Sequence, residues 1–290
     1  MTNVKTEPKT IDGVPVEVVT SCALCGDGAA NQVLQIGGWR IEFCARCGLG
    51  RTNPRAAEHK VAQLYDPKYF TAKDSGEPPS DHEAERAIRH QAKRVRHMRK
   101  VATAGRLLEI GPGFGFFCEA AKRNGFEVEA LEISEWAAEQ ARRRYGLTAH
   151  TGTVDAFDPH GKTYDVIAMF HVLEHVSDPL VCLRRLRSWL NPRGAVIIEV
   201  PNCASDDARG QGQSWGGWQP RYHFWHFKPE TLCEVLRRAG FEPGEMQFAR
   251  SEYVRHRLKR IPVLGLFRSC FDCFYHGDWM RIVARALPNE

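Results

Sequence analysis

Short apolar runs alternate with amphipathic stretches from about residue 102 to the end of the chain. Such runs are typical of buried strands, and apolar residues three or four positions apart are typical of helices. The predicted strands are Arg106–Ile110, Glu127–Glu132, Thr148–His150, Tyr164–Phe170 and Ala195–Val200. The predicted helices are Phe114–Asn124, Glu135–Tyr145, Pro179–Leu190 and Pro229–Ala239. This alternation predicts an α/β fold with a parallel sheet covered by helices.

Two more strands are predicted near Glu245–Arg250 and Trp279–Ala286, without a clear helix-only crossover between them. Parallel neighbours need a long crossover, whereas a short link joins antiparallel ones. The last strand is therefore expected to run antiparallel to the others.

Composition divides the chain into four parts. They are a polar tail (1–19), a module dense in cysteine and glycine (20–72), a linker with an amphipathic helix over Asp81–Lys100 (73–101), and the main domain (102–290). Within the main domain, 202–227 and 251–277 are expected to be insertions that cover a substrate. The first is long and rich in glycine and aromatic residues, which is typical of lids and binding loops.

The 290 residues carry a net charge of +5 and are 43% hydrophobic, which suits a globular core and does not argue for an anionic partner. The sequence has no apolar run long enough to span a membrane and no apolar signal core at its start. Ten cysteines without a secretion signal indicate a reducing compartment, so a cytoplasmic location is expected.

A glycine-rich loop follows the first predicted strand, with glycines at 111, 113 and 115. This spacing indicates a pocket for an adenosine-bearing ligand, but Phe116 stands where a dinucleotide-binding loop needs glycine. Glu132 ends the second strand, where a carboxylate can accept from both ribose hydroxyls. Asp155 follows the third strand, within reach of an adenine amino group, and Glu109 stands beside the loop, where it can attract a cation.

These motifs, in this order, resemble the class I S-adenosylmethionine-dependent methyltransferases. The similarity continues through the stretches 164–179 and 190–201 to Gly240-Phe241. The resemblance implies a Rossmann-like seven-stranded sheet with an antiparallel last strand, and methyl transfer from S-adenosylmethionine. It also implies cofactor contacts for Glu109, Gly111, Gly113, Glu132, Asp155 and Phe170, with Phe170 and His171 on the methionine side.

Cys22, Cys25, Cys44 and Cys47 form two C-x-x-C pairs. Two such pairs supply four thiolates to one tetrahedral zinc ion, and this closed set of ligands indicates a structural role. Disulfides or free thiols are the alternative. The module also resembles the zinc-ribbon leader of bacterial methyltransferases associated with sugar or polysaccharide modification, which implies a small, cyclic or glycan-related acceptor. The isolated pair Cys270 and Cys273 is expected to pack rather than to bind metal.

His171, Glu174 and His175 follow the fourth strand, where an acceptor would arrive. Their spacing allows all three to share one face of a helical turn. His171 is a candidate general base, and the trio is a candidate divalent metal site. Some quinone and RNA methyltransferases use a related E-x-x-E-H pattern for magnesium, but His171 replaces its first acid, and magnesium prefers oxygen. We favour a capping and anchoring role for Glu174 and His175.

His223 and His226, in the aromatic segment 202–227, are the next catalytic candidates, whereas Phe224 and Phe227 are expected to fix this segment to the core. An RNA base methyltransferase is the closest alternative function, but the modest charge argues against nucleic acid. A non-catalytic S-adenosylmethionine-binding scaffold and a nicotinamide dehydrogenase are further alternatives. The basic stretch 256–268 allows peripheral membrane contact, although an insertion over the substrate is favoured.

Overall fold

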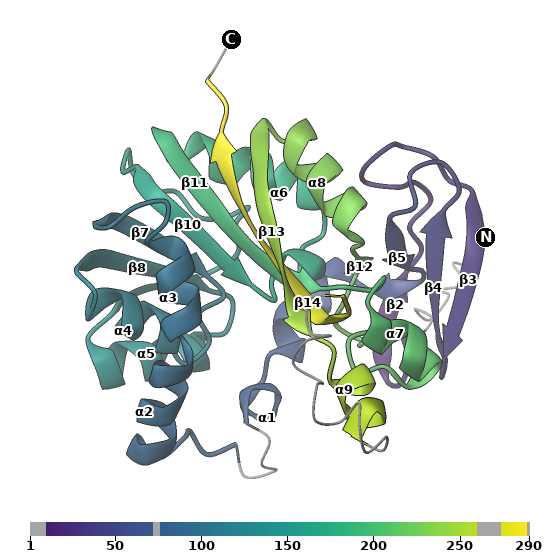
Figure 1. Ribbon diagram of the computed structural model, residues 1–290, viewed down its shortest axis with the longest axis horizontal. Coiled ribbons are helices and arrows are strands. Elements are labelled where there is room, and N and C mark those ends of the chain that lie inside the picture. The colour runs from purple at the N-terminus through teal and green to yellow at the C-terminus, as the bar shows by residue number, and fades with distance from the viewer. Residues whose placement is uncertain (1–9, 72–75, 260–273, 289–290) are drawn as a thin grey trace, which may run out of the picture.

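A computed structural model describes residues 10–71, 76–259 and 274–288. Within these residues, seven strands form the main sheet in the order β13-β14-β11-β10-β7-β8-β9 (Figure 1). Their bounds are β7 Gly105–Ile110, β8 Phe126–Glu132, β9 Thr148–Thr151, β10 Tyr164–Phe170, β11 Leu190–Pro201, β13 Phe241–Arg250 and β14 His276–Ala286. β14 runs antiparallel to both of its neighbours, and the pairs from β11 to β9 are all parallel. The predicted fold class, with its antiparallel last strand, is confirmed.

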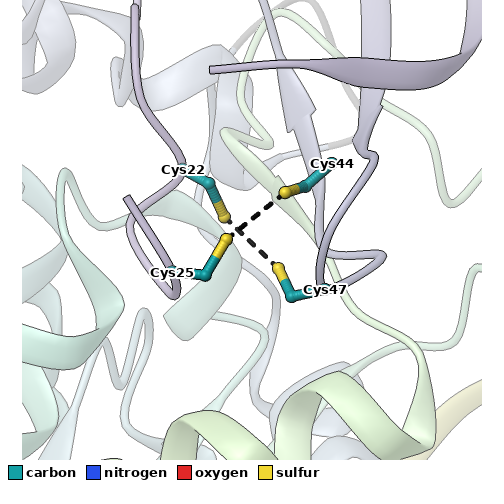
Figure 2. Close-up of side chains that lie close together, drawn as sticks. All are labelled: Cys22, Cys25, Cys44 and Cys47. Carbon is teal, nitrogen blue, oxygen red and sulfur yellow. Dashed lines mark hydrogen bonds between the residues drawn. The ribbon is translucent and has the colours of Figure 1, made fainter. Parts of the chain in front are cut away.

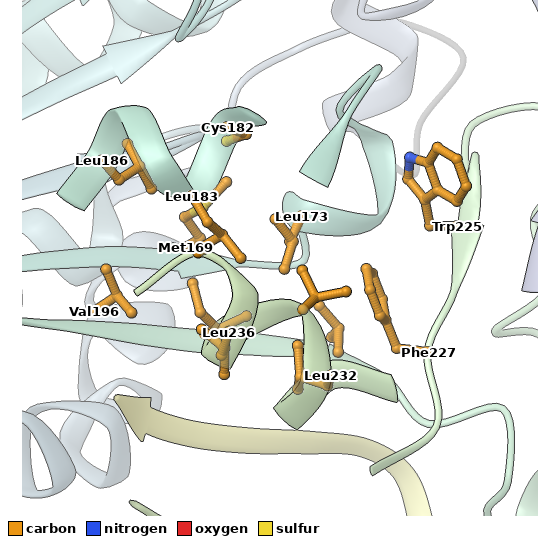
Figure 3. Close-up of a cluster of buried hydrophobic side chains, with 14 of the residues drawn as sticks. Met169, Leu173, Cys182, Leu183, Leu186, Val196, Trp225, Phe227, Leu232 and Leu236 are labelled. Atoms are coloured by element: carbon orange, nitrogen blue, oxygen red, sulfur yellow. The ribbon is translucent and has the colours of Figure 1, made fainter. Parts of the chain in front are cut away.

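Successive side chains of each strand point to opposite faces of the sheet. The apolar residues of one strand therefore contribute to two cores, one on each face. Ile167 and Met169 of β10 lie in one buried cluster, and Val166 and Ala168 lie in another. Helices α6 (Pro179–Ser188) and α8 (Pro229–Arg238) cover the first face (Figure 3). Helices α2 (Asp81–His90), α3 (Ala92–Met98) and α4 (Phe116–Lys122) cover the second face. Helix α5 (Glu135–Tyr145) packs beside β8 and β9.

Several helix bounds differ from the predictions for local reasons. Helix α4 begins at Phe116 rather than at Phe114, because Gly115 at its N-cap has a left-handed φ of 77°. The predicted helix Asp81–Lys100 is divided between α2 and α3 at Gln91. Helix α6 ends at Ser188, since Leu190 already pairs with Tyr164 at the start of β11.

The N-terminal module contains β1 (Thr10–Ile11), β2 (Val14–Glu17), β3 (Ala30–Ile36), β4 (Trp39–Cys44), β5 (Gly50–Thr52) and β6 (Arg55–Ala56). These are followed by the 3-10 helix η1 (Glu58–Leu64) and the short helix α1 (Pro67–Phe70). Its larger sheet has the order β12-β5-β4-β3. Strand β12 (Trp225–His226) comes from the main domain, so the two parts share one sheet, and the purple strands in Figure 1 lie beside α7.

The segment 202–227 connects the two parts of the molecule. It holds α7 (Asp206–Gln211), the 3-10 helix η3 (Gly212–Ser214) and β12. Trp215 and Trp218 are buried in one cluster with Ile41 and Phe43 of the module. Phe224 and Phe227 are fully buried, as predicted, and Figure 3 shows Phe227 beside Leu232 of α8.

Several predictions concern residues outside the described ones. The residues concerned are 1–9 of the tail, 72 of the cysteine module, 73–75 of the linker, 260–273 of the second predicted insertion with the Cys270 and Cys273 pair, and most of the basic stretch 256–268. The described part of 251–277 begins with α9 (Glu252–Lys259). None of the helices in the described residues combines the length and the apolar character needed to cross a membrane.

Candidate functional site

A cavity of about 750 Å³ lies at the carboxyl ends of β7, β8 and β10. Five of the candidate residues line it: Gly111, Glu132, Asp155, His171 and His175. The aromatic side chains Tyr65, Tyr69 and Phe70 of the module line it as well. The cavity is therefore bounded by both parts of the chain, and the module's aromatic residues are a wall that the sequence analysis did not assign.

The glycine loop turns sharply between β7 and α4. Gly111 has a φ of 68°, and an added Cβ would lie 2.5 Å from Cγ2 of Val172. Gly113 has a φ of 54°, and the ring of Phe70 lies 3.7 Å from the place of its absent Cβ. A side chain at Gly111 would therefore be both strained and crowded, which explains the glycine there.

Glu132 holds this loop from the end of β8. Its carboxylate accepts hydrogen bonds from the backbone N–H groups of Gly113, at 2.9 Å, and of Ser134, at 3.0 Å. Burial raises the pKa of Glu132, and these N–H donors oppose that effect. Each oxygen keeps further acceptor capacity toward the cavity. The exposed Asp155 lines the same cavity, so two carboxylates fit the hydroxyl and amino groups of an adenosine-bearing ligand.

Three residues with predicted cofactor contacts lie behind the cavity lining. Glu109 is buried and accepts a hydrogen bond from Sγ of Cys118 at 2.9 Å, and burial raises the pKa of Glu109 to about 7. Phe170 packs against Phe117, with ring centroids 4.7 Å apart. The backbone N–H of Gly113 donates a hydrogen bond to Glu132. Their direct contacts with a cofactor stay predictions.

His171 stands at the end of β10 with a φ of 58°, which is uncommon for a residue other than glycine and is often found at functional sites. Its Nε2 lies 3.1 Å from Oε1 of Glu199, and its Nδ1 lies 3.6 Å from Oε1 of Glu174. Burial would lower the pKa of His171, but the neighbouring carboxylates of Glu174 and Glu199 outweigh it and raise the pKa to about 9. His171 is thus fixed by two carboxylates while its ring reaches the cavity.

Glu199 is the centre of a buried charge network. Arg94 donates to one of its oxygens, and Nε of Arg281 donates to the other at 2.6 Å. Burial would raise the pKa of Glu199, yet His171 and the two arginines hold it far below its usual range. This network was not predicted from the sequence. In the sequence, the network is marked by Glu199, which is the single acid within the apolar run of β11.

His175 lines the cavity beside Glu174, which is fully buried. Both belong to the 3-10 helix η2 (Leu173–His175). Nδ1 of His175 lies 3.0 Å from the hydroxyl of Tyr65 and 3.0 Å from the carbonyl oxygen of Tyr222. His175 therefore connects the cavity wall to the segment that leads into β12.

The candidates His223 and His226 are buried and do not line the cavity. The ring of His223 meets the ring of His175 edge-on, with centroids 4.7 Å apart. Burial lowers the pKa of His223 to about 3. The hydroxyl of Thr52 donates to the carbonyl oxygen of His223, so Nε2 of His226, 3.0 Å away, donates to that hydroxyl. Both rings thus lie outside the cavity lining, and their catalytic role stays a prediction.

The four cysteines converge in the module (Figure 2). Sγ of Cys22 lies 3.5 Å from Sγ of Cys47, and Sγ of Cys25 lies 3.4 Å from Sγ of Cys44. All four sulfurs lie within 4.8 Å of one another. A tetrahedral zinc ion with Zn–S bonds of about 2.3 Å separates its sulfurs by about 3.8 Å, so the cluster has nearly the dimensions that zinc requires.

Comparison with known families agrees with this geometry. The sequence profile of the family described as "Methyltransferase domain" matches residues 80–245, which is more than half of the chain. The chain belongs to this methyltransferase domain family. The matched residues extend from α2 to β13 and include the glycine loop, Glu132, Asp155 and His171. The cysteine cluster lies outside the match.

Curated relatives of this family member include the ubiquinone biosynthesis O-methyltransferases of Ruegeria pomeroyi and Cereibacter sphaeroides. Each is 33% identical over 153 residues, which are 48% of this chain and 60% of the relative. The chain thus spans about three fifths of the length of these relatives.

Solved structures share the fold at low identity. The 1,6-didemethyltoxoflavin-N1-methyltransferase of Burkholderia thailandensis has a TM-score of 0.54 at 19% identity and covers 89% of this chain and all of its own length. An Archaeoglobus fulgidus methyltransferase has a TM-score of 0.53 at 18% identity, with 69% of this chain and 94% of its own covered. The [4+2]-cyclase SpnF has a TM-score of 0.56 at 18% identity, and the match covers 81% of this chain and 98% of SpnF. This fold therefore supports more than one chemistry.

Proposed function

We propose that this protein transfers a methyl group from S-adenosylmethionine to a hydroxyl group of a small cyclic acceptor. The observation that carries the proposal is the shared cavity. It is lined by the carboxylates of Glu132 and Asp155, by His171, and by the aromatic wall formed by Tyr65, Tyr69 and Phe70.

Glu132 and Asp155 are the residues that would hold the donor. The carboxylate of Glu132, fixed by two backbone N–H groups, suits the ribose hydroxyls, and Asp155 suits the adenine amino group. When bound, S-adenosylmethionine supplies an electrophilic methyl group. The chain's own task is then to exclude water and to align the acceptor.

The aromatic wall supports a cyclic acceptor. The rings of Tyr65 and Tyr69 meet edge-on with centroids 4.8 Å apart, and those of Tyr69 and Phe70 with centroids 5.1 Å apart. Such surfaces bind flat or cyclic molecules with little loss of side-chain freedom. The relatives named as ubiquinone biosynthesis O-methyltransferases support oxygen as the methylated atom and a small molecule as the acceptor. A sugar ring suits the same wall.

His171 is proposed as the residue that contacts the acceptor. Glu174 and Glu199 fix its ring from two sides, so its orientation in the cavity is set before an acceptor binds. A side chain fixed in this way aligns a hydroxyl at little further cost in entropy.

The cysteine cluster is proposed to hold a structural zinc ion. Four sulfurs fill its tetrahedral shell and leave no open position for catalysis. Two cations lie close to this region: Arg238 donates to the carbonyl oxygen of Leu24 at 2.6 Å, and Nζ of Lys228 lies 4.9 Å from the ring centroid of Phe43. They partly balance the negative charge of four thiolates. Elemental analysis tests the assignment, and a folded protein without metal would refute it.

A transfer assay with isotopically labelled methyl donor tests the function. Phenolic and quinol acceptors, sugars and RNA are offered in parallel, together with calorimetry of S-adenosylhomocysteine. We expect labelled product with a small cyclic hydroxyl compound, and no label on RNA. Binding without label on any acceptor would favour the scaffold function, and absence of binding would refute the proposal.

A further inference from the structure

A second groove, of about 790 Å³, is lined by residues of α3, β13, α9 and β14 (Figure 1). It shares no lining residue with the cavity of the candidate site. Six lysine and arginine side chains line it, against three aspartate and glutamate side chains. The part of the chain that the structure describes therefore holds a second hollow with an excess of positive charge, which favours an anionic ligand.

Three of these cations follow one side of α3 and the turn after it. Lys93, Arg96 and Lys100 are exposed, and no carboxylate of the described residues forms an ion pair with them. Positions three, four and seven apart lie on the same side of a helix, and seven residues rise by about 10 Å. Like charges at these spacings repel one another, so a ligand with negative charge at more than one place along the groove would relieve the repulsion.

His97 lies among these cations. Only 6% of its surface is exposed, it lines the groove, and its Nδ1 has no hydrogen-bond partner among the described residues. Burial lowers the pKa of His97, and the positive charges of Arg281 and Lys100 lower it further. The acids Glu245 and Glu199 oppose this shift without cancelling it. A buried polar atom without a partner is uncommon, and an anion in the groove would favour the protonated ring, whose nitrogens both donate.

Arg281 connects the groove to the charge network of Glu199. It lines the groove although it is buried, and its guanidinium lies 4.7 Å from the ring centroid of Trp279. Nε of Arg281 donates to Glu199 at 2.6 Å, and Oε1 of Glu199 lies 3.1 Å from Nε2 of His171. Negative charge beside Arg281 would therefore act on the same carboxylate that fixes His171 in the cavity.

We propose that this groove binds a small soluble molecule with several phosphate groups, and that its binding changes the environment of His171 through Arg281 and Glu199. A phosphate group carries up to two negative charges and accepts from lysine and arginine alike. The exposed acids Glu245 and Glu252 also line the groove and would repel the continuous phosphate backbone of a nucleic acid. Binding of the anion does not depend on the proposed methyl transfer.

Calorimetry of the full-length, zinc-loaded protein with sodium tripolyphosphate tests the site. We expect one molecule bound per chain. The double variant Lys93→Ala with Lys100→Ala should weaken binding at least about tenfold, and His97→Leu should weaken it about fivefold. The matched control is Arg89→Ala with Arg99→Ala, because it removes two exposed charges of α2 and α3 that do not line the groove. Its affinity should stay within about twofold of the wild type.

Histidine NMR tests the connection to the cavity. Tripolyphosphate should shift the imidazole signal of His171, which is identified by its loss in His171→Asn. The same addition should leave this signal in place in the lysine double variant. A signal of His171 that does not move on saturation of the wild type would overturn the connection.

Absence of binding to the wild type, or equal losses in the two double variants, would overturn the site itself. RNA and vesicles of anionic phospholipid are offered as competitors. Displacement of tripolyphosphate by either one at a lower phosphate concentration would assign the groove to a macromolecule or a membrane surface, and would overturn the assignment to a small soluble anion.

Discussion

The carboxylate of Glu132 accepts a hydrogen bond from the backbone N–H of Gly113 at 2.9 Å. The acid at the end of the second strand therefore fixes the glycine loop in addition to facing the cavity. Glu132→Ala should weaken S-adenosylhomocysteine binding by a factor on the order of 100, because hydrogen bonds to a charged group contribute about 1.5–3 kcal/mol each. Calorimetry measures this loss.

Glu127→Gln is the control for that experiment. Glu127 lies on the same strand, and its side chain is exposed at the opposite end. Its substitution should leave the affinity unchanged. Equal losses in the two variants would mean that the effect reports a weakened β8 rather than a ligand contact.

His171→Asn should reduce kcat by about 100-fold, since loss of an aligning group commonly costs that much. Asparagine tolerates the left-handed φ of 58°, so the backbone is preserved while the imidazole is removed. The affinity for S-adenosylhomocysteine should stay within about threefold, which calorimetry checks. A variant with normal kcat would exclude His171 from the reaction.

Cys44→Ser should remove zinc and lower the melting temperature by on the order of 10 °C, which corresponds to a few kcal/mol for a chain of this size. The two parts of the molecule share a sheet, so we expect one cooperative transition rather than two. Differential scanning calorimetry with elemental analysis measures both. Cys233→Ser is the control, because this half-buried thiol lies outside the cluster.

Glu109 should make stability depend on pH. Its pKa is raised from 4.5 to about 7 by burial, so the folded state binds the proton more tightly than the unfolded state. Stability is therefore highest below pH 4.5 with respect to this group and falls as pH rises toward 7, by up to about 3 kcal/mol. Glu109→Gln should remove this decline, because an amide oxygen can still accept from Cys118. Urea unfolding at about pH 5 and pH 8 tests it, and parallel wild-type and variant curves would contradict it.

The sequence predicted what local patterns determine. The strands of the main sheet follow from short apolar runs, and the places of Glu132 and Asp155 in the cavity follow from parallel strands ending at one edge. The cysteine cluster follows from two short spacings that each form one turn. Each of these features depends on residues close together in the sequence, or on a rule of topology.

The unpredicted features depend on partners far apart in the chain. Glu199 is stabilised in the core by Arg94 and Arg281, which approach it from α3 and β14, together with His171. The residues of the aromatic wall lie close together in the sequence, but their place in the cavity lining depends on how the module packs. The pairing of Trp225 with Arg51 has no local signal either, because β12 is only two residues long.

The shared sheet also sets an order of events during synthesis. Thr52 and His226 touch across 174 residues, so β5 leaves the ribosome long before its outer neighbour β12 exists. Until then the edge of β5 is unpaired, and an unpaired strand edge can form hydrogen bonds with strands of other chains. The cysteine cluster is complete by residue 47 and lies next to β5 in the chain. Metal captured by the nascent chain would then fix the shape of this edge while the rest of the protein is still being made.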